Sequence, residues 1–496
     1  MTDPTVTDHV GDLLGDAWAS FAAATKTTAQ DTPPAERWAL LQLILTEAGG
    51  LVRALADGRA DYPELQPCPE CGVLSPSPAK PELEQKPVDK QAGDEDETFV
   101  RRQRDREGGR KFTVDEGVEL RHWTNAVRSI DGYKDATDEQ CASALAAWHT
   151  HVQPLDEPLR FVSWPGYTGV LLYELLAARH GAMVQPVPLE SELVKEITAS
   201  SRTLRMWSFI NPEAELKPGD VVTELDVTAQ FLAAAGSTEC GDGEPKILDN
   251  VDPDWLPKLI TVPGYVELTG KPDLSTLSAA ARYSFAKLDT GWRLPTPALK
   301  YLVKDRDVVV PIGRAVVWPS GDKNRGRPAQ YGRRLAVWAT EVRTARLALT
   351  HAARAGEPGA GIALAVLKRM YAAFLGGVLK SEKTNDRGTL RHDWADMVVA
   401  TAGVNALRAI DKAGAIPFGG MKDSFWFASP VTDAPFRPDG LQYSDQPGEH
   451  FDKPGKWHLN RWGEITDNLI RHHADGRIGL VRNDVIAANK ARKAAD

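Results

Sequence analysis

The sequence has only four cysteines among its 496 residues. So few thiols in a chain this long exclude a disulfide-rich scaffold and favour a reducing compartment. The sequence also lacks any apolar run approaching the ~20 residues that a membrane-spanning helix needs. Its N-terminus is rich in Asp and Thr and does not have the pattern of a signal peptide. We therefore expect a cytoplasmic protein without a membrane partner.

The sequence lacks a net positive charge: 68 acidic residues outnumber 59 basic ones and the net charge is −9, which argues against a surface that attracts nucleic acid everywhere. The charge is unevenly distributed, however. Between Lys300 and Arg346, eleven basic residues stand against four acidic ones, a local charge of about +7. Within this stretch, the loop that carries Lys323, Arg325 and Arg327 is expected to contact DNA phosphates. The alternative is a solvated basic face without a ligand.

Composition and periodicity predict an α+β protein with several segments. Residues 1–60 indicate a small helical N-terminal module. Residues 61–111, rich in Pro, Glu, Lys and Asp, indicate a flexible linker. Residues 112–219 alternate helix and strand signals and predict an α/β domain. They include a capping box at Thr137-Asp-Glu-Gln140 and a short strand at Leu159-Arg-Phe-Val162.

The linker contains Cys68-Pro-Glu-Cys71, which has the spacing of half a zinc site. A structural zinc ion takes four ligands, so Cys68 and Cys71 would need two more from elsewhere. The other cysteines, Cys141 and Cys240, are single and distant in sequence. A zinc ion held partly by Cys68 and Cys71 and a plain turn are both open interpretations.

Two aspartates have the sequence context of metal ligands. Asp226 ends the β-branched strand Val221–Val227, and Asp423 lies beside the turn of a strand–turn–strand pattern. Nucleotidyl transfer needs two divalent cations, and Mg²⁺ or Mn²⁺ takes hard oxygen ligands, often only one or two carboxylates. If the two strands are neighbours, Asp226 and Asp423 can hold such cations. A turn or cap residue is the alternative for either aspartate alone.

Three motifs follow in the order found in family B DNA polymerases, which this region resembles. They are Asp226-Val-Thr-Ala-Gln-Phe231, Lys368-Arg-Met-Tyr-Ala-Ala-Phe-Leu-Gly376 and Met421-Lys-Asp-Ser424. The resemblance implies that Asp226 and Asp423 hold the catalytic metals and that Lys368 meets the incoming triphosphate. It implies that Phe231 packs under the sugar, excludes a 2′-hydroxyl and so selects dNTPs.

The sequence departs from the family pattern in several places. Ala372-Ala373 and Leu375 replace the family's Asn-Ser and Tyr, and Met421 replaces the first acid of the third motif. Lys456-Trp-His458 stands where the family has a Lys-x-Tyr element that holds the primer strand, so Lys456 is expected to contact DNA. No Asp-x-Glu in a strand context precedes residue 220, and we therefore expect no proofreading exonuclease.

The resemblance implies a polymerase-like architecture around these motifs. Residues 220–290 and 381–460 would form the palm sheet, and residues 291–380 would form inserted helical fingers. Residues 461–496 would form a basic helical tail. Arg333 and Arg334 open a long helical pattern within the expected fingers and are expected to contact the nucleotide.

A closer likeness is to the actinomycete telomere-associated proteins, carried by Asp226 to Ala235 and by the hairpin Lys422 to Pro430. It implies replication of chromosome ends, plasmids, integrative elements or phage in actinobacteria, association with the nucleoid, and a terminal protein as priming partner. The alternatives are a non-catalytic DNA-end-binding protein with a degenerate polymerase fold, and a primase-like or template-independent transferase. Phe231 disfavours the primase, because a primase uses ribonucleotides.

Overall fold

The computed structural model describes residues 65–67, 74–76, 116–154, 156–180, 207–242, 245–320, 330–377, 379, 391–430, 434–446 and 452–495. The chain divides into two compact units, residues 1–91 and residues 92–496. In the first unit, β1 (Leu65–Pro67) and β2 (Leu74–Pro76) form an antiparallel pair within the segment predicted as a linker. The predicted zinc ligands Cys68 and Cys71 and the predicted helical module 1–60 lie outside the described residues.

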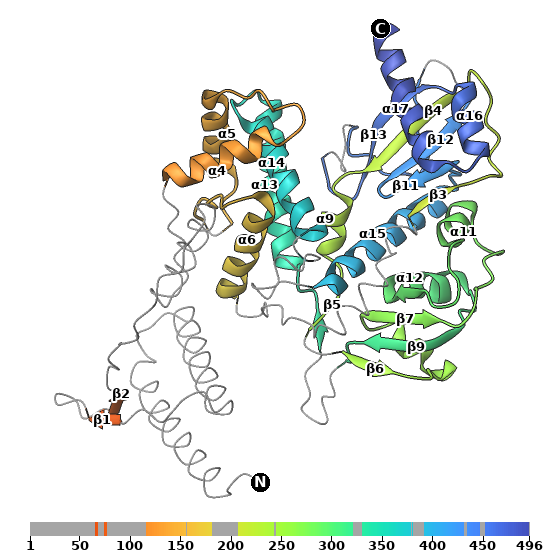
Figure 1. The fold of residues 1–496 in the computed structure, drawn as a ribbon, viewed down its shortest axis with the longest axis horizontal. Coiled ribbons are helices and arrows are strands. Elements are labelled where there is room, and N and C mark those ends of the chain that lie inside the picture. The colour runs from red at the N-terminus through yellow and green to blue at the C-terminus, as the bar shows by residue number, and fades with distance from the viewer. Residues whose placement is uncertain are drawn as a thin grey trace, which may run out of the picture. The chain divides into compact units, whose positions relative to one another are not determined.

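The second unit is built around a five-stranded antiparallel sheet in the order β13-β4-β12-β11-β3. Its strands are β3 (Ser208–Ile210), β4 (Val221–Val227), β11 (Gly419–Met421), β12 (Ser424–Ser429) and β13 (Trp457–Glu464). Figure 1 shows the yellow-green β4 between the blue strands β12 and β13. The β-branched residues of β4 and the aromatic residues of β12 suit a buried pleated surface, and the sheet predicted for this region is present.

The two faces of this sheet pack against different helices. On one face, Leu225 and Val227 share a core with Leu407 and Ile410 of α15 (His392–Ala413). On the other face, Val222 packs with residues of α16 (Asp467–Ala474) and α17 (Ile478–Ala495). The segment predicted as a basic C-terminal tail is therefore a structural cover of the sheet, because its apolar residues complete that core.

A second sheet, in the order β6-β9-β7-β8, is entirely antiparallel. Its strands are β6 (Lys246–Leu248), β7 (Gly264–Leu268), β8 (Arg293–Pro295) and β9 (Ile312–Val317). The short helices around it are η1 (Pro253–Trp255), α10 (Leu256–Leu259), α11 (Ala279–Phe285), α12 (Thr296–Lys300) and η2 (Tyr301–Asp305). The sheet spans the predicted palm–fingers boundary at residues 290 and 291, because strands on both sides of that boundary pair.

The remaining helices form one cluster around a shared hydrophobic core. They are α4 (Glu116–Arg128), α5 (Asp138–His151), α6 (Pro165–His180), α9 (Gln230–Ala235), α13 (Ala336–Arg354) and α14 (Ala360–Gly376). The capping box at Thr137 and Gln140 begins α5 as expected. Between residues 116 and 180 the structure has helices and no strand, so this part of the predicted α/β domain is helical and joins the segment predicted as fingers.

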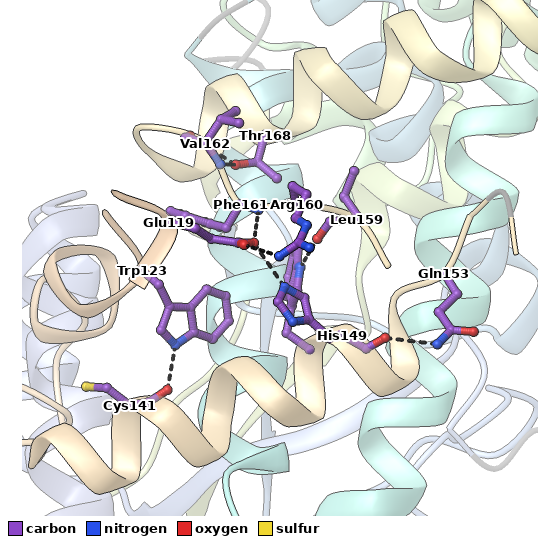
Figure 2. Close-up of polar contacts among 11 residues, drawn as sticks. Glu119, Trp123, Cys141, His149, Gln153, Leu159, Arg160, Phe161, Val162 and Thr168 are labelled. Atoms are coloured by element: carbon purple, nitrogen blue, oxygen red, sulfur yellow. Dashed lines mark hydrogen bonds and ion pairs between the residues drawn. The ribbon is translucent and has the colours of Figure 1, made fainter. Parts of the chain in front are cut away.

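The strand expected at Leu159–Val162 is absent because its backbone hydrogen bonds go elsewhere. The Phe161 N–H donates to the buried carboxylate of Glu119 over 2.7 Å, and Figure 2 shows this contact together with those of His149 and Arg160. The indole of Trp148 donates to the Leu159 carbonyl over 2.6 Å. The segment is therefore held extended by side chains instead of by a neighbouring strand.

Two short strands, β5 (Cys240–Gly241) and β10 (Tyr331–Gly332), pair beside the start of α15. The fully buried Arg391 donates to the Gly241 carbonyl and to both oxygens of Asp393. This paired and hydrogen-bonded charge ties β5 to the N-terminus of α15. No helix among the described residues is long and apolar enough to cross a membrane.

Candidate active site

Asp226 and Asp423 lie on neighbouring elements of the five-stranded sheet. Asp226 is the sixth residue of β4 and pairs with Ser424, the first residue of β12. The Val227 N–H donates to the Asp423 carbonyl over 3.2 Å, so the β4–β12 ladder extends to the turn that carries Asp423. The two aspartates predicted as a pair therefore meet at one end of the sheet.

A tight turn presents Asp423. Met421 and Ser424 pair across the β11–β12 hairpin, which leaves a two-residue loop of Lys422 and Asp423. Lys422 has a left-handed backbone with φ of 61°, a conformation that two-residue hairpins require and that Gly adopts more easily. Its N–H donates to the Trp207 carbonyl over 2.7 Å, which fixes the turn despite this strain.

The Asp226 carboxyl is mostly buried and holds its proton unusually strongly. Burial raises its pKa to about 7, and the negative charges of Glu224 and Asp423 add to the rise, while Ser424 and Arg461 oppose it. Its Oδ2 accepts a hydrogen bond from Asn460 Nδ2 over 2.7 Å. Its Oδ1 is buried and has no hydrogen-bond partner among the described residues. That oxygen is thus available for a ligand.

Two further acids contribute to the local field. Burial raises the pKa of Asp423, with a contribution from the charge of Glu224. Glu224, two residues before Asp226 on the same face of β4, is fully buried and accepts from Arg461 over 2.6 Å. Its Oε1 also has no hydrogen-bond partner within the described part of the chain. The concentration of negative charge favours a bound cation.

Two cations, Arg346 and Lys368, lie on α13 and α14. Burial lowers the pKa of Lys368, and the nearby positive charge of Arg346 lowers it further. The Lys368 side chain nevertheless remains accessible to solvent, so surrounding protein atoms, not complete enclosure, cause the desolvation. Burial raises the pKa of Tyr371, one helical turn after Lys368, and the charges of Arg346 and Asp423 also act on it. The charges of one of the cations and of one of the carboxylates thus both influence Tyr371.

His458, on β13, interacts both with the strand that carries Asp226 and with the charges of the two cations. It pairs with Asp226 in the sheet, and its Nδ1 lies 2.9 Å from the Thr228 hydroxyl. Burial lowers its pKa, and the positive charges of Lys368 and Arg346 act in the same direction while Asp445 opposes them. His458 acts in turn on the pKa of Asp423, so its electrostatic neighbours include an acid of the turn and the cations of α13 and α14.

The other residues predicted for the site differ in their burial and in their contacts. Phe231 is half-buried in α9 and packs against both of the large hydrophobic cores. Arg334 makes a 2.9 Å ion pair with Asp242, so its charge is already compensated, whereas Arg333 is exposed. Lys456 lies directly before β13, and its ammonium donates to the Gln442 amide oxygen. The predicted DNA contacts Lys323, Arg325 and Arg327 lie outside the described residues.

The donor set fits a hard divalent cation. Asp226 and Asp423 offer carboxylate oxygens, and the buried Asp226 Oδ1 has no hydrogen-bond partner among the described residues. The described residues contain no group of three or more His, Cys, Asp or Glu that could hold a metal ion. Mg²⁺ often takes only one or two carboxylates and completes its shell with water and substrate phosphate, so two aspartates are a sufficient protein contribution.

Sequence reasoning missed several residues of this site: Glu224, Arg346, Tyr371 and Asn460. Arg346 is buried on the apolar stripe of α13, between Val342 and Leu349. A basic residue on such a stripe is a signal that could have indicated it, because a buried cation needs a partner or a ligand. Glu224 gives a similar signal, since it is a second acid within a short β-branched strand that already carries Asp226.

The chain was compared with protein families, curated proteins and solved structures, and only solved structures match it. No protein family and no curated protein matches the sequence. Among solved structures, the chain is similar to phi29 DNA polymerase complexed with single-stranded DNA, with TM-score 0.37 and 13% identity over 67% of this chain and 58% of that one. For the same polymerase complexed with primer-template DNA, the TM-score is 0.36 and the identity 14%, over 70% and 63% of the two chains. The chain thus spans less than two thirds of the polymerase chains it matches.

Proposed function

We propose that this protein is a metal-dependent nucleotidyltransferase that extends a DNA strand on a template with dNTPs, and that it lacks proofreading. The observation that carries this proposal is the meeting of Asp226, on β4, and Asp423, in the turn before β12. The charges of Lys368 and Arg346, on two helices, act on His458, the residue of β13 that pairs with Asp226. Carboxylates facing cations are the arrangement that a metal-bound triphosphate requires, because the phosphates need positive charge on all sides.

The roles of the residues follow from their chemistry. Asp226 and Asp423 would hold Mg²⁺ or Mn²⁺ through their carboxylate oxygens. When bound, the cations lower the pKa of the attacking hydroxyl and stabilise charge on the transferred phosphoryl group. Lys368 would bind the triphosphate as a compact point charge, and Arg346 would add a planar fork of donors. Phe231 would close the site beneath the sugar and exclude ribonucleotides.

The residues of β13 and the basic loop would hold DNA. Lys456 directly precedes β13, and His458 is the residue of β13 that pairs with Asp226. A primer terminus would therefore lie along this strand. Lys323, Arg325 and Arg327 would bind phosphates without reading sequence. The resemblance to telomere-associated proteins extends the proposal to replication of linear DNA ends in actinobacteria, with a terminal protein as the primer in place of a nucleic acid.

A second candidate function is a non-catalytic protein that binds DNA ends with the same fold. The observation that favours it is the replacement of polar residues of the family motifs, by Met421 beside the Asp423 turn and by Ala372-Ala373 in α14. Two carboxylate oxygens argue the other way, Asp226 Oδ1 and Glu224 Oε1. A binding scaffold gains nothing from them, since each is buried at a cost in desolvation energy and has no hydrogen-bond partner among the described residues.

Extension of a labelled primer–template by the full chain, with Mg²⁺ or Mn²⁺ and each dNTP, tests the proposal. Template-directed extension should be lost in Asp423→Ala and in the Asp226→Ala, Asp423→Ala double variant. Asp254→Ala, which removes an exposed carboxylate near the second sheet, should retain activity and serves as the matched control. Activity retained in the double variant would refute the proposal. DNA binding without incorporation under either cation would support the non-catalytic alternative.

A further inference from the structure

Strand β13 contains a bulge beside the candidate metal ligands. His458 pairs with Asp226 and Leu459 with Leu225, but the next pair joins Arg461 to Glu224, so Asn460 is an extra residue on β13. In a regular ladder Asn460 would pair with Glu224, and Arg461 would face the opposite side of the sheet. The bulge therefore turns two consecutive side chains onto the face that carries Asp226.

Both side chains donate to carboxylates on that face. Asn460 Nδ2 donates to Asp226 Oδ2 over 2.7 Å, and an Arg461 guanidinium nitrogen donates to Glu224 Oε2 over 2.6 Å. In each acid the contact occupies one oxygen, and the other has no hydrogen-bond partner in the described part of the chain. One oxygen of Asp226 is thus fixed by the protein while the other remains available.

The two donors differ in what they can do. Arg461 is a cation that compensates the fully buried Glu224, which is a structural requirement for a charge in that position. Asn460 carries no charge, so it orients Asp226 without neutralising it and without competing with a cation for the site. A carboxylate that ligates a metal is commonly oriented by such a neutral hydrogen bond.

We propose that Asn460 is a positioning residue that holds Asp226 through Oδ2, so that Oδ1 is the oxygen offered to a divalent cation. The inference rests on the proposed function of Asp226 as a metal ligand. In this proposal the β13 bulge orients the Asp226 carboxylate, and the ion pair between Glu224 and Arg461 holds the bulge in place. A role for the bulge in packing alone does not account for the contact, because the amide of Asn460 meets a carboxylate and not the hydrophobic core.

The test measures Mn²⁺ binding to the full chain by calorimetry and by electron paramagnetic resonance, in alkaline buffer where Asp226 is ionised. Asn460→Ala should weaken Mn²⁺ binding about 10–100-fold, the usual effect of removing a residue that orients a ligand. Asn460→Gln, which keeps the amide, should restore part of the affinity. Asn468→Ala, which removes an exposed Asn of α16, should bind Mn²⁺ as the wild type does.

The Mn²⁺ dependence of catalysis distinguishes a positioning role of Asn460 from a purely structural one. In Asn460→Ala, the Mn²⁺ concentration needed for half-maximal incorporation should rise, while kcat at saturating Mn²⁺ should largely recover. A loss of kcat that saturating Mn²⁺ does not restore would overturn the inference. Unchanged Mn²⁺ affinity in Asn460→Ala, with binding lost in Asp226→Ala, would also overturn it and leave the proposed function intact. Unchanged Mn²⁺ binding in both Asp226→Ala and Asp423→Ala would refute the proposed function itself.

Discussion

Asp226 and Asp423 belong to sequence segments almost two hundred residues apart, yet the amide next to Asp226 donates to the carbonyl of Asp423. This single ladder contact brings two carboxylates to one end of a sheet, where each is partly buried. The negative charge of Asp423 contributes to the raised pKa of Asp226. Burial and these neighbouring charges favour the protonated form of Asp226, so its protonation controls what the site can bind.

Cation binding should depend steeply on pH near neutrality. Burial raises the pKa of Asp226 to about 7, and a cation binds only the ionised carboxylate. We expect Mn²⁺ affinity and nucleotide incorporation to fall as the pH drops through about 7. Glu224→Gln should move the midpoint to lower pH, because it removes a negative charge beside Asp226. A midpoint near 4, the ordinary range of an aspartate, would contradict the raised pKa of Asp226.

The same shift predicts the pH dependence of stability without a cation. Asp226 has a higher pKa in the folded than in the unfolded chain, so between the ordinary value of 3.8 and about 7 the folded state binds the extra proton. Stability should therefore decrease as the pH rises across this range. Asp226→Asn should flatten the dependence and melt at a higher temperature than the wild type above pH ~7 when no cation is present. Thermal melts at a series of pH values test this, and added Mn²⁺ should stabilise the wild type only.

Lys368 should matter for nucleotide affinity, whereas its neighbour Arg369 should not. Lys368 lies near Arg346 and His458, but the charge of Arg369 acts on the exposed Asp131. A hydrogen bond to a charged group contributes about 1.5–3 kcal/mol, so Lys368→Ala should raise the KM for dNTP roughly 10–100-fold. Lys368→Arg should recover much of this loss. An equal effect of Arg369→Ala in steady-state kinetics would show that the helix contributes only general positive charge.

Local sequence patterns were enough to predict the strand and the turn that carry the two aspartates, because nearby residues determine both elements. Lys422-Asp423 is such a turn, and the apolar strand before Asp226 is readable without a partner. The bulge at Asn460 was not predictable in this way. A bulge exists only relative to the strand it pairs with, and β13 pairs with a strand more than two hundred residues earlier.

Long-range packing also limits what the sequence can predict about which segments share a core. The helices of residues 116–180 and those of residues 336–376 each have apolar faces, but the sequence does not say which faces meet. For Arg346, too, the sequence does not tell which neighbours the side chain meets. Its position on the apolar stripe of α13 is visible in the sequence, but its approach to Lys368 depends on how α13 and α14 pack.

Phe231 should decide the choice of sugar, as the family resemblance implies. Its half-buried ring packs against both large hydrophobic cores, so it is held in place and cannot easily move away from a 2′-hydroxyl. Phe231→Val should increase ribonucleotide incorporation relative to dNTP roughly 10–100-fold, the scale on which a pocket excludes one small group. Competition between rNTP and dNTP in primer extension measures this ratio. An unchanged ratio with normal dNTP use would remove Phe231 from the site.

Glu119 should be the main polar determinant of stability in the helical cluster. Its carboxylate is fully buried and accepts from His149, Arg160 and the Phe161 N–H, as Figure 2 shows. Burial alone would raise the pKa of Glu119, but these hydrogen bonds and the His149 charge outweigh it and lower the pKa below its ordinary value. The corresponding stability is present above the ordinary pKa of 4.5 and is lost as the pH falls through the lower, folded value.

Glu119→Ala leaves the Phe161 N–H without its buried acceptor, whereas Arg160 is partly exposed and can be hydrated, so the substitution should cost about 1–3 kcal/mol of unfolding free energy. Asp138→Ala is the matched control, because Asp138 pairs with Arg128 at the surface with 85% of its side chain exposed, where an ion pair contributes about 0–1 kcal/mol. Hydrogen exchange of α4, α5 and the segment after α5 measures the loss locally. Equal protection in the two variants would mean that the carboxylate of Glu119 does not hold this segment. Loss of protection confined to Glu119→Ala would show that one buried acid fixes the segment where the sequence had predicted a strand.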